Sequence, residues 1–181
     1  MIYILKGHDL RHAVEEMILH LLPTVITEQA ETEPEQGNYC VSELEINGQT
    51  AKATATVKIY DKIEQKSREA TLPNTDELAN KRVLTEIIKL SIYDAILLFL
   101  DKAPEWGSLT GVRPAKHARG LMERGLTRPE AAVQFREKFG VSAERTALTM
   151  RAAAHAQSAI DILPENSVSL YIGIPFCPSR C

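Results

Sequence analysis

The apolar and polar positions of the first third of the chain predict a small sheet that carries one early helix. Residues 1–6 are apolar enough to form a first strand. Beyond them, Asp9 is expected to cap a helix, and Pro23 is expected to end it. The apolar stripe of this helix recurs every three to four positions and consists of Leu10, Val14, Met17, Ile18 and Leu21.

Residues 27–37 are acidic and show no period, so we expect a loop there. After this loop, apolar residues alternate with polar ones, a period of two that is typical of strands. Asn47-Gly48 predicts a tight hairpin turn between two strands. In the second strand the inward positions are expected to be Ala51, Ala53, Ala55, Val57 and Ile59. A polar third strand over residues 63–72 is expected at a sheet edge.

The rest of the chain contains residues that typically begin and end helices. A long helix is predicted from Thr75 or Asp76 to about Lys102. Its longest unbroken apolar run, residues 95–100, is far shorter than the roughly 20 residues that span a bilayer, so we expect a core helix and no membrane contact. Three more helices are predicted between Pro114 and Gly125, between Thr127 and Gly140, and from Ser142 to about Asp161.

These elements predict an α/β fold of the α+β-like kind. Residues 1–165 are expected to form an amino-terminal domain, with a small sheet over about residues 1–72 and a mainly helical part over about residues 75–162. Residues 166–181 are expected to begin a second domain. The break at Pro164 and the polar residues after it suit a linker between the two.

Composition limits the function classes. The 181 residues carry a formal net charge of -3, which argues against a nucleic-acid binder that relies on a general positive field. Three cysteines, an odd number, disfavour a disulfide framework and favour a reducing cytoplasm. The apolar start is too short for a signal peptide.

The most informative chemistry lies in the last dozen residues. Leu170, Ile172 and Ile174 fall on one face of an expected buried strand, which Pro175 would end. Cys177 and Cys181 follow in the loop, where thiolates suit an iron–sulfur cluster. From spacing alone, two unrelated buried thiols are the favoured interpretation.

The sequence around these cysteines narrows the choice. Residues 171–181 resemble the cluster loop of the radical S-adenosylmethionine superfamily, and Tyr-x-x-Ile-Pro-Phe-Cys is similar to its oxygen-independent coproporphyrinogen III oxidase group. Residues 106–114, Trp-Gly-Ser-Leu-Thr-Gly-Val-Arg-Pro, resemble the HemZ-type coproporphyrinogen dehydrogenase branch. There are two departures. The third cysteine of the motif would lie three residues beyond Cys181, and Gly173 stands where many members have His.

The resemblance implies a site and an activity. Cys177 and Cys181 would be the first two ligands of a 4Fe-4S cluster, and Tyr171 would contact the methionine part of S-adenosylmethionine. Residues 166–181 would be the first strand of a truncated partial TIM barrel. The whole enzyme, an oxidoreductase of porphyrin and haem biosynthesis, would oxidatively decarboxylate coproporphyrinogen III, with an electron donor and acceptor as partners. We expect this chain to be an amino-terminal fragment, inactive alone, with no catalytic residue of its own.

Two other functions stay open. Relatives of this group bind haem and transfer it, which makes a haem chaperone an alternative. Residues 1–165 could instead bind a protein or RNA through the basic cluster Arg113, Lys116, Arg119, Arg124 and Arg128.

The remaining polar residues have simpler interpretations. The loop at residues 107–113, with Lys116 and Arg119 beside it, could hold an anion or be an ordinary glycine turn. His8, His12 and His20 are expected to be solvated, and Cys40 to be a small core residue.

Overall fold

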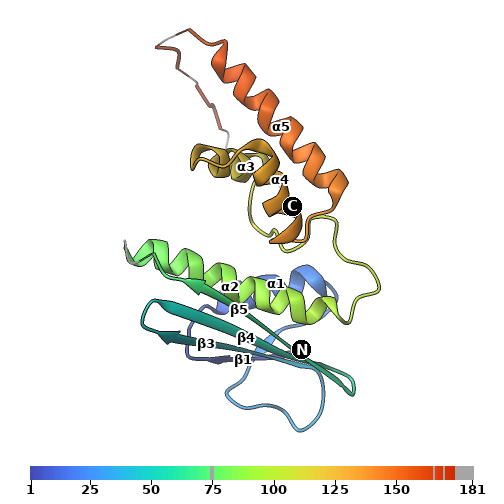
Figure 1. Cartoon of the computed structure of the whole chain (residues 1–181). Helices are drawn as coiled ribbons and strands as arrows, with labels where there is room; N and C mark the ends of the chain where they lie inside the picture. Colours follow the sequence, from blue (N-terminus) through green and yellow to red (C-terminus); the bar gives the residue numbers. More distant parts are fainter. Residues whose placement is uncertain (74–75, 165, 169, 174–181) are drawn as a thin grey trace.

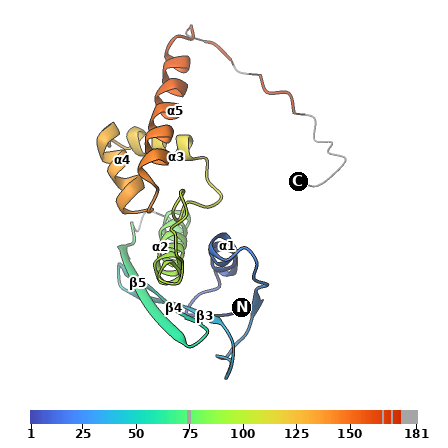
Figure 2. The same cartoon turned by 90° about the vertical axis from the view of Figure 1, so that its right-hand side faces the viewer.

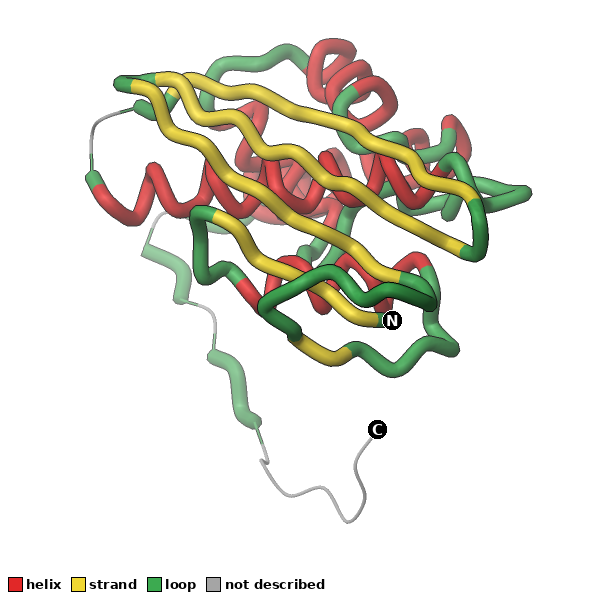
Figure 3. The backbone as a smooth tube through the Cα atoms, turned by 90° about the horizontal axis from the view of Figure 1, so that it is seen from below, coloured by secondary structure: helices red, strands yellow, loops and turns green. Residues whose placement is uncertain are grey.

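A five-stranded mixed sheet forms one layer of the computed structural model, which describes residues 1–73, 76–164, 166–168 and 170–173 (Figures 1 and 3). The strand order is β2-β1-β3-β4-β5. The strands are β1 (Ile2–Lys6), β2 (Glu28–Gln29), β3 (Tyr39–Asn47), β4 (Thr50–Ile59) and β5 (Lys62–Thr71). β1 runs parallel to β2 and β3, whereas β3, β4 and β5 form an antiparallel meander.

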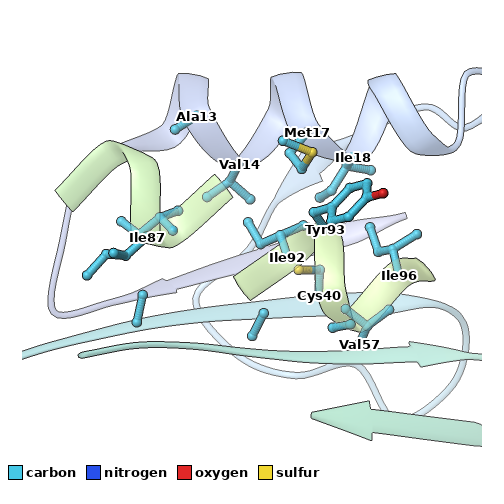
Figure 4. Packing of buried hydrophobic residues seen from close by; sticks show 14 of the residues in the cluster. Ala13, Val14, Met17, Ile18, Cys40, Val57, Ile87, Ile92, Tyr93 and Ile96 are labelled. Atoms are coloured by element: carbon cyan, nitrogen blue, oxygen red, sulfur yellow. The ribbon is translucent and has the colours of Figure 1, made fainter. Parts of the chain in front are cut away.

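Two helices, α1 (Arg11–Leu21) and α2 (Glu77–Leu97), cover one face of this sheet (Figure 2). The inward side of β4 carries buried alanines at positions 51, 53 and 55, and these small side chains let α2 approach the sheet closely. Figure 4 shows Val14 and Met17 of α1 packing with Ile92 of α2 above Cys40 and Val57 of the sheet. The predicted α/β class is therefore confirmed.

The other helices form a second layer on the far side of α2 (Figures 1 and 2). They are α3 (Pro114–Glu123), α4 (Arg128–Glu137) and α5 (Ala143–Asp161). Their core includes Phe135, Phe139 and Met150 and reaches α2 through Leu90. Leu90 thus joins the helical layer to the helix that covers the sheet.

The predicted starts of α4 and α5 and the predicted end of α3 are confirmed by the capping residues. Thr127 and Glu130 form a complete capping box at the start of α4. The hydroxyl of Ser142 accepts a hydrogen bond from the Arg145 N–H at 3.2 Å and so caps α5. Gly125 has a φ of 99°, as expected of a glycine that closes a helix.

Three local predictions differ from the structure. Asp9 does not cap α1: the N-cap is Leu10, whose N–H donates to Nδ1 of His8 at 3.2 Å. α2 ends at Leu97 rather than near Lys102, because backbone bonds three residues apart tighten the chain there. The short strand β2 lies inside the predicted loop, since a parallel edge strand needs backbone pairing but no apolar side chains.

The β3–β4 hairpin is confirmed, but its turn is shifted by one residue. Asn47 pairs with Thr50, so the two turn residues are Gly48 and Gln49. Only Gly48 has a positive φ, of 60°. That pattern fits a turn in which glycine takes the first central position. β5 lies at the sheet edge as predicted.

The described residues after α5 do not form the expected strand. Leu170, Tyr171 and Ile172 are exposed and unpaired, so the prediction of a buried strand is wrong for residues 170–173. A strand requires a neighbouring strand for its hydrogen bonds, and the described part of the chain places none beside this segment. The predicted barrel start at residues 166–181 stays a prediction. In the described ranges, no helix combines the length and apolarity needed to cross a membrane.

Candidate functional site

The residues predicted to bind a cluster and its cofactor are only partly described. Tyr171 is 92% exposed. Cys177 and Cys181 lie outside the described residues, so their role as iron ligands remains a prediction. Within the described ranges, no group of three or more His, Cys, Asp or Glu side chains is arranged to hold a metal ion.

The third cysteine of the chain is confirmed as a core residue. Cys40 is completely buried in β3 between the sheet and its helices. Burial raises the pKa of its thiol to about 12, so it stays protonated at neutral pH. It is therefore not available as a third thiolate for the predicted cluster.

The structure contains a pocket that the terminal motif did not reveal. It has a volume of about 610 Å³ and lies between α2 and the loop that connects α2 to α3. α2 contributes its outer face to the wall, and the loop contributes Ser108, Leu109, Thr110 and Val112. His117 of α3 and Phe139 close the remaining side. The pocket therefore contains most of the glycine loop singled out in the sequence.

Glycine at position 107 fixes one end of this loop. Gly107 has a φ of 57°, and a Cβ there would lie 1.9 Å from the Phe139 carbonyl oxygen. The same oxygen accepts hydrogen bonds from the N–H and the hydroxyl of Ser108, at 2.8 and 3.1 Å. His20 of α1 lies within hydrogen-bonding distance of the Gly107 carbonyl, with 2.9 Å between Nε2 and the oxygen. The loop is thus tied to both layers.

Lys89 of α2 fixes the other end of the loop. Its ammonium donates to Thr110 Oγ1 at 3.0 Å and to Glu16 Oε2 of α1 at 2.6 Å. Burial raises the pKa of Glu16, but hydrogen bonds with Lys89 and Thr110 outweigh it, and the net pKa is lowered from 4.5. Gly111 lies next to this pair, and a Cβ there would meet Glu16 Oε1 at 2.9 Å.

The charges around the pocket are unequally matched. Glu86 pairs with Lys138 at 2.5 Å, and Lys89 is neutralised by Glu16. Lys81 and Arg82, also in the wall, form no ion pair with any other described residue. The wall therefore carries a net positive charge at the end formed by the first turns of α2.

His117 lies on the apolar side of the wall. Its ring lies 5.4 Å from the ring of Phe139 and 5.6 Å from that of Phe135, centroid to centroid. Burial lowers its pKa below 6.5, with Arg124 and Lys138 adding to the effect and Glu86 opposing it. Nε2 is shielded from solvent and has no hydrogen-bond partner among the described residues. The imidazole is therefore held neutral near pH 7.

The sequence-based candidates fit this site in part. Ser108 and Thr110 line the pocket, but Lys116 and Arg119 do not, and Arg119 pairs with Glu123 at 3.3 Å. The cations come from α2 instead. The signal that could have found them is the helical spacing of Lys81, Arg82, Thr85 and Lys89, which places polar residues on one side of α2.

The histidine predictions require a correction. His12 is exposed, as expected. His8 and His20 are not fully solvated: Nε2 of His8 lies 3.0 Å from the Ser42 hydroxyl, and His20 reaches the Gly107 loop. Both contacts involve residues far away in the sequence, which the polar pattern of one helix cannot reveal.

The comparisons with known proteins agree with one part of the sequence analysis. No protein-family model matches the chain. A 79-residue segment is 32% identical to the oxygen-independent coproporphyrinogen-III oxidase-like protein HemZ of Bacillus subtilis, and it spans 42% of this chain but only 16% of HemZ. A crystal structure of protein VC0702 from Vibrio cholerae aligns with 89% of this chain and 95% of its own at 12% identity, with a TM-score of 0.31. The chain is thus related, over the matched segment, to a coproporphyrinogen oxidase-like protein.

Proposed function

We propose that this chain is part of an oxidoreductase of haem biosynthesis that acts on coproporphyrinogen III through radical S-adenosylmethionine chemistry. The observation that carries the proposal is the similarity to HemZ. The resemblance of residues 171–181 to the cluster loop supports it as well, because the thiolates of Cys177 and Cys181 are the kind of soft ligand that iron–sulfur clusters require.

The cysteines of the chain fit two of the three ligands such a cluster needs. Cys177 and Cys181 would bind iron, whereas Cys40 is excluded by its burial. The third thiolate would then have to be a cysteine other than these three. A cluster held by these residues would supply one-electron reduction for the cleavage of S-adenosylmethionine. Tyr171 is exposed, so it is free to contact the methionine part of that cofactor.

Anaerobic reconstitution of the full-length gene product with iron and sulfide tests the cluster. We expect bound iron, bound sulfide and visible charge-transfer absorbance, and loss of all three in Cys177→Ser and in Cys181→Ser. Cys40→Ala is the matched control, because it also removes one thiol but should leave the cluster intact. A full-length protein that binds no iron, or a Cys177→Ser variant that retains the whole cluster, would contradict the proposal.

The substrate is tested separately on the reconstituted protein. We expect carbon dioxide release from coproporphyrinogen III in the presence of S-adenosylmethionine and a reductant. Haem binding without carbon dioxide release would instead support the carrier function and would overturn the enzymatic one.

A further inference from the structure

We propose that the pocket between α2 and the 107–112 loop binds a small amphipathic anion, a molecule with an apolar body and one negatively charged group. Nothing in the proposed iron–sulfur chemistry requires this site. The inference stands on the lining, the volume and the charge of the pocket alone.

The body of the ligand would contact the apolar part of the wall. This part combines Leu90, Leu109 and Phe139 at the base with Leu78 and Val112 nearer the rim. Its volume of about 610 Å³ lies within the range of roughly 300 to 1,000 Å³ that is usual for small-molecule sites. A lining of this kind favours an aromatic or aliphatic body over a sugar or a bare ion.

The negative group would be recognised by Lys81 and Arg82. The other charged side chains of the wall, Glu86 and Lys89, are each satisfied by an ion pair. The two α2 cations have no such partner in the described part of the chain, and they lie in the first turns of α2. A wall with two unmatched positive charges beside an apolar base is complementary to an amphipathic anion.

The test uses a pair of dyes that differ in one charged group. 1-Anilinonaphthalene-8-sulfonate is an apolar body with a sulfonate, and N-phenyl-1-naphthylamine is the same body without it. Trp106 is the single tryptophan of the chain and lies two residues from the pocket-lining Ser108, so energy transfer from Trp106 detects bound dye, and the variants below assign that dye to the pocket. We expect saturable transfer to the sulfonate dye with one site per chain.

Two double variants distinguish the positive charges of the pocket wall from positive charges that lie nearby but outside it. Lys81→Gln with Arg82→Gln should lower the affinity for the sulfonate dye about tenfold, which corresponds to about 1.4 kcal/mol. It should leave the affinity for the neutral dye unchanged. Arg113→Gln with Lys116→Gln is the matched control, because it removes the same charge next to the pocket but outside its cationic wall. It should change neither affinity.

Thr85→Phe tests the location. Thr85 lies in the wall, and a phenyl ring there should occupy the pocket and abolish transfer from Trp106 to both dyes. The proposal is overturned by the absence of saturable transfer, by equal losses in the two double variants, or by full binding to Thr85→Phe. Replacing Cys177 and Cys181 by serine should leave dye binding unchanged, so failure here and failure of the cluster proposal are distinguishable.

Discussion

Replacing Gly107 by alanine should detach the pocket loop from Phe139 and His20. The resulting loss in the free energy of unfolding can be divided into a backbone part and a contact part. Gly107 has a φ of 57°, a left-handed conformation that costs an L-residue about 1 to 2 kcal/mol. The new Cβ would also lie 1.9 Å from the Phe139 carbonyl oxygen, which is rigid backbone. The loop would have to move by more than 1 Å, and two contacts of its backbone would be lost, the Ser108 N–H bond to the Phe139 oxygen and the contact of the Gly107 carbonyl with His20.

Each of those two contacts contributes about 1 kcal/mol. Together with the backbone conformation they predict a loss of about 3 to 4 kcal/mol in the free energy of unfolding for Gly107→Ala. Gly48→Ala is the matched control. Gly48 has nearly the same φ, 60°, but nothing lies within 4 Å of its added Cβ. It should therefore lose only the conformational part, about 1 to 2 kcal/mol.

Urea unfolding followed by far-ultraviolet circular dichroism measures both free energies. The expected difference between the variants is about 2 kcal/mol, or roughly 4 to 8 °C in the melting temperature of a chain of this size. Equal destabilisation of the two variants would refute the reasoning, because it would mean that the contact between Gly107 and Phe139 does not constrain the loop.

Three further predictions concern other contacts. Since the folded pKa of Glu16 is depressed, its ion pair with Lys89 should stabilise the protein above about pH 4.5, and that stabilisation should be lost as the pH falls through the folded pKa; Glu16→Gln should flatten this acid-side decline in urea midpoints. Ser142→Ala removes the cap of α5 and should lower the free energy of unfolding, measured with urea, by about 1 kcal/mol. A variant as stable as the parent protein would show that this cap does not stabilise α5. The Cys40 thiol should react with a thiol reagent only in denaturant when the other two cysteines are serine, and rapid labelling of the native protein would contradict its burial.

Local features of the fold were predictable from the sequence because they depend on neighbours only a few residues apart. The alternation in β4 identified its buried face, and the capping box at Thr127 located the start of α4. The predicted Asp9 cap of α1 was wrong because a competing local contact forms: His8 accepts the hydrogen bond from the Leu10 N–H at the start of that helix. The segment at residues 170–173 has strand-forming residues, but a strand also needs a partner.

The amino-acid order alone therefore determined the fold class, most of the helix boundaries, the core position of Cys40 and the family resemblance of two short motifs. Only the tertiary structure decided that a loop, two helices and Phe139 form one pocket with two unmatched cations in its wall. The decisive contacts join residues far apart in the chain: His20 and Gly107 are 87 positions apart, and Glu16 and Lys89 are 73 apart. Such contacts arise from the packing of α1 and α2 side by side on one face of the sheet, and no periodicity within a single element encodes them.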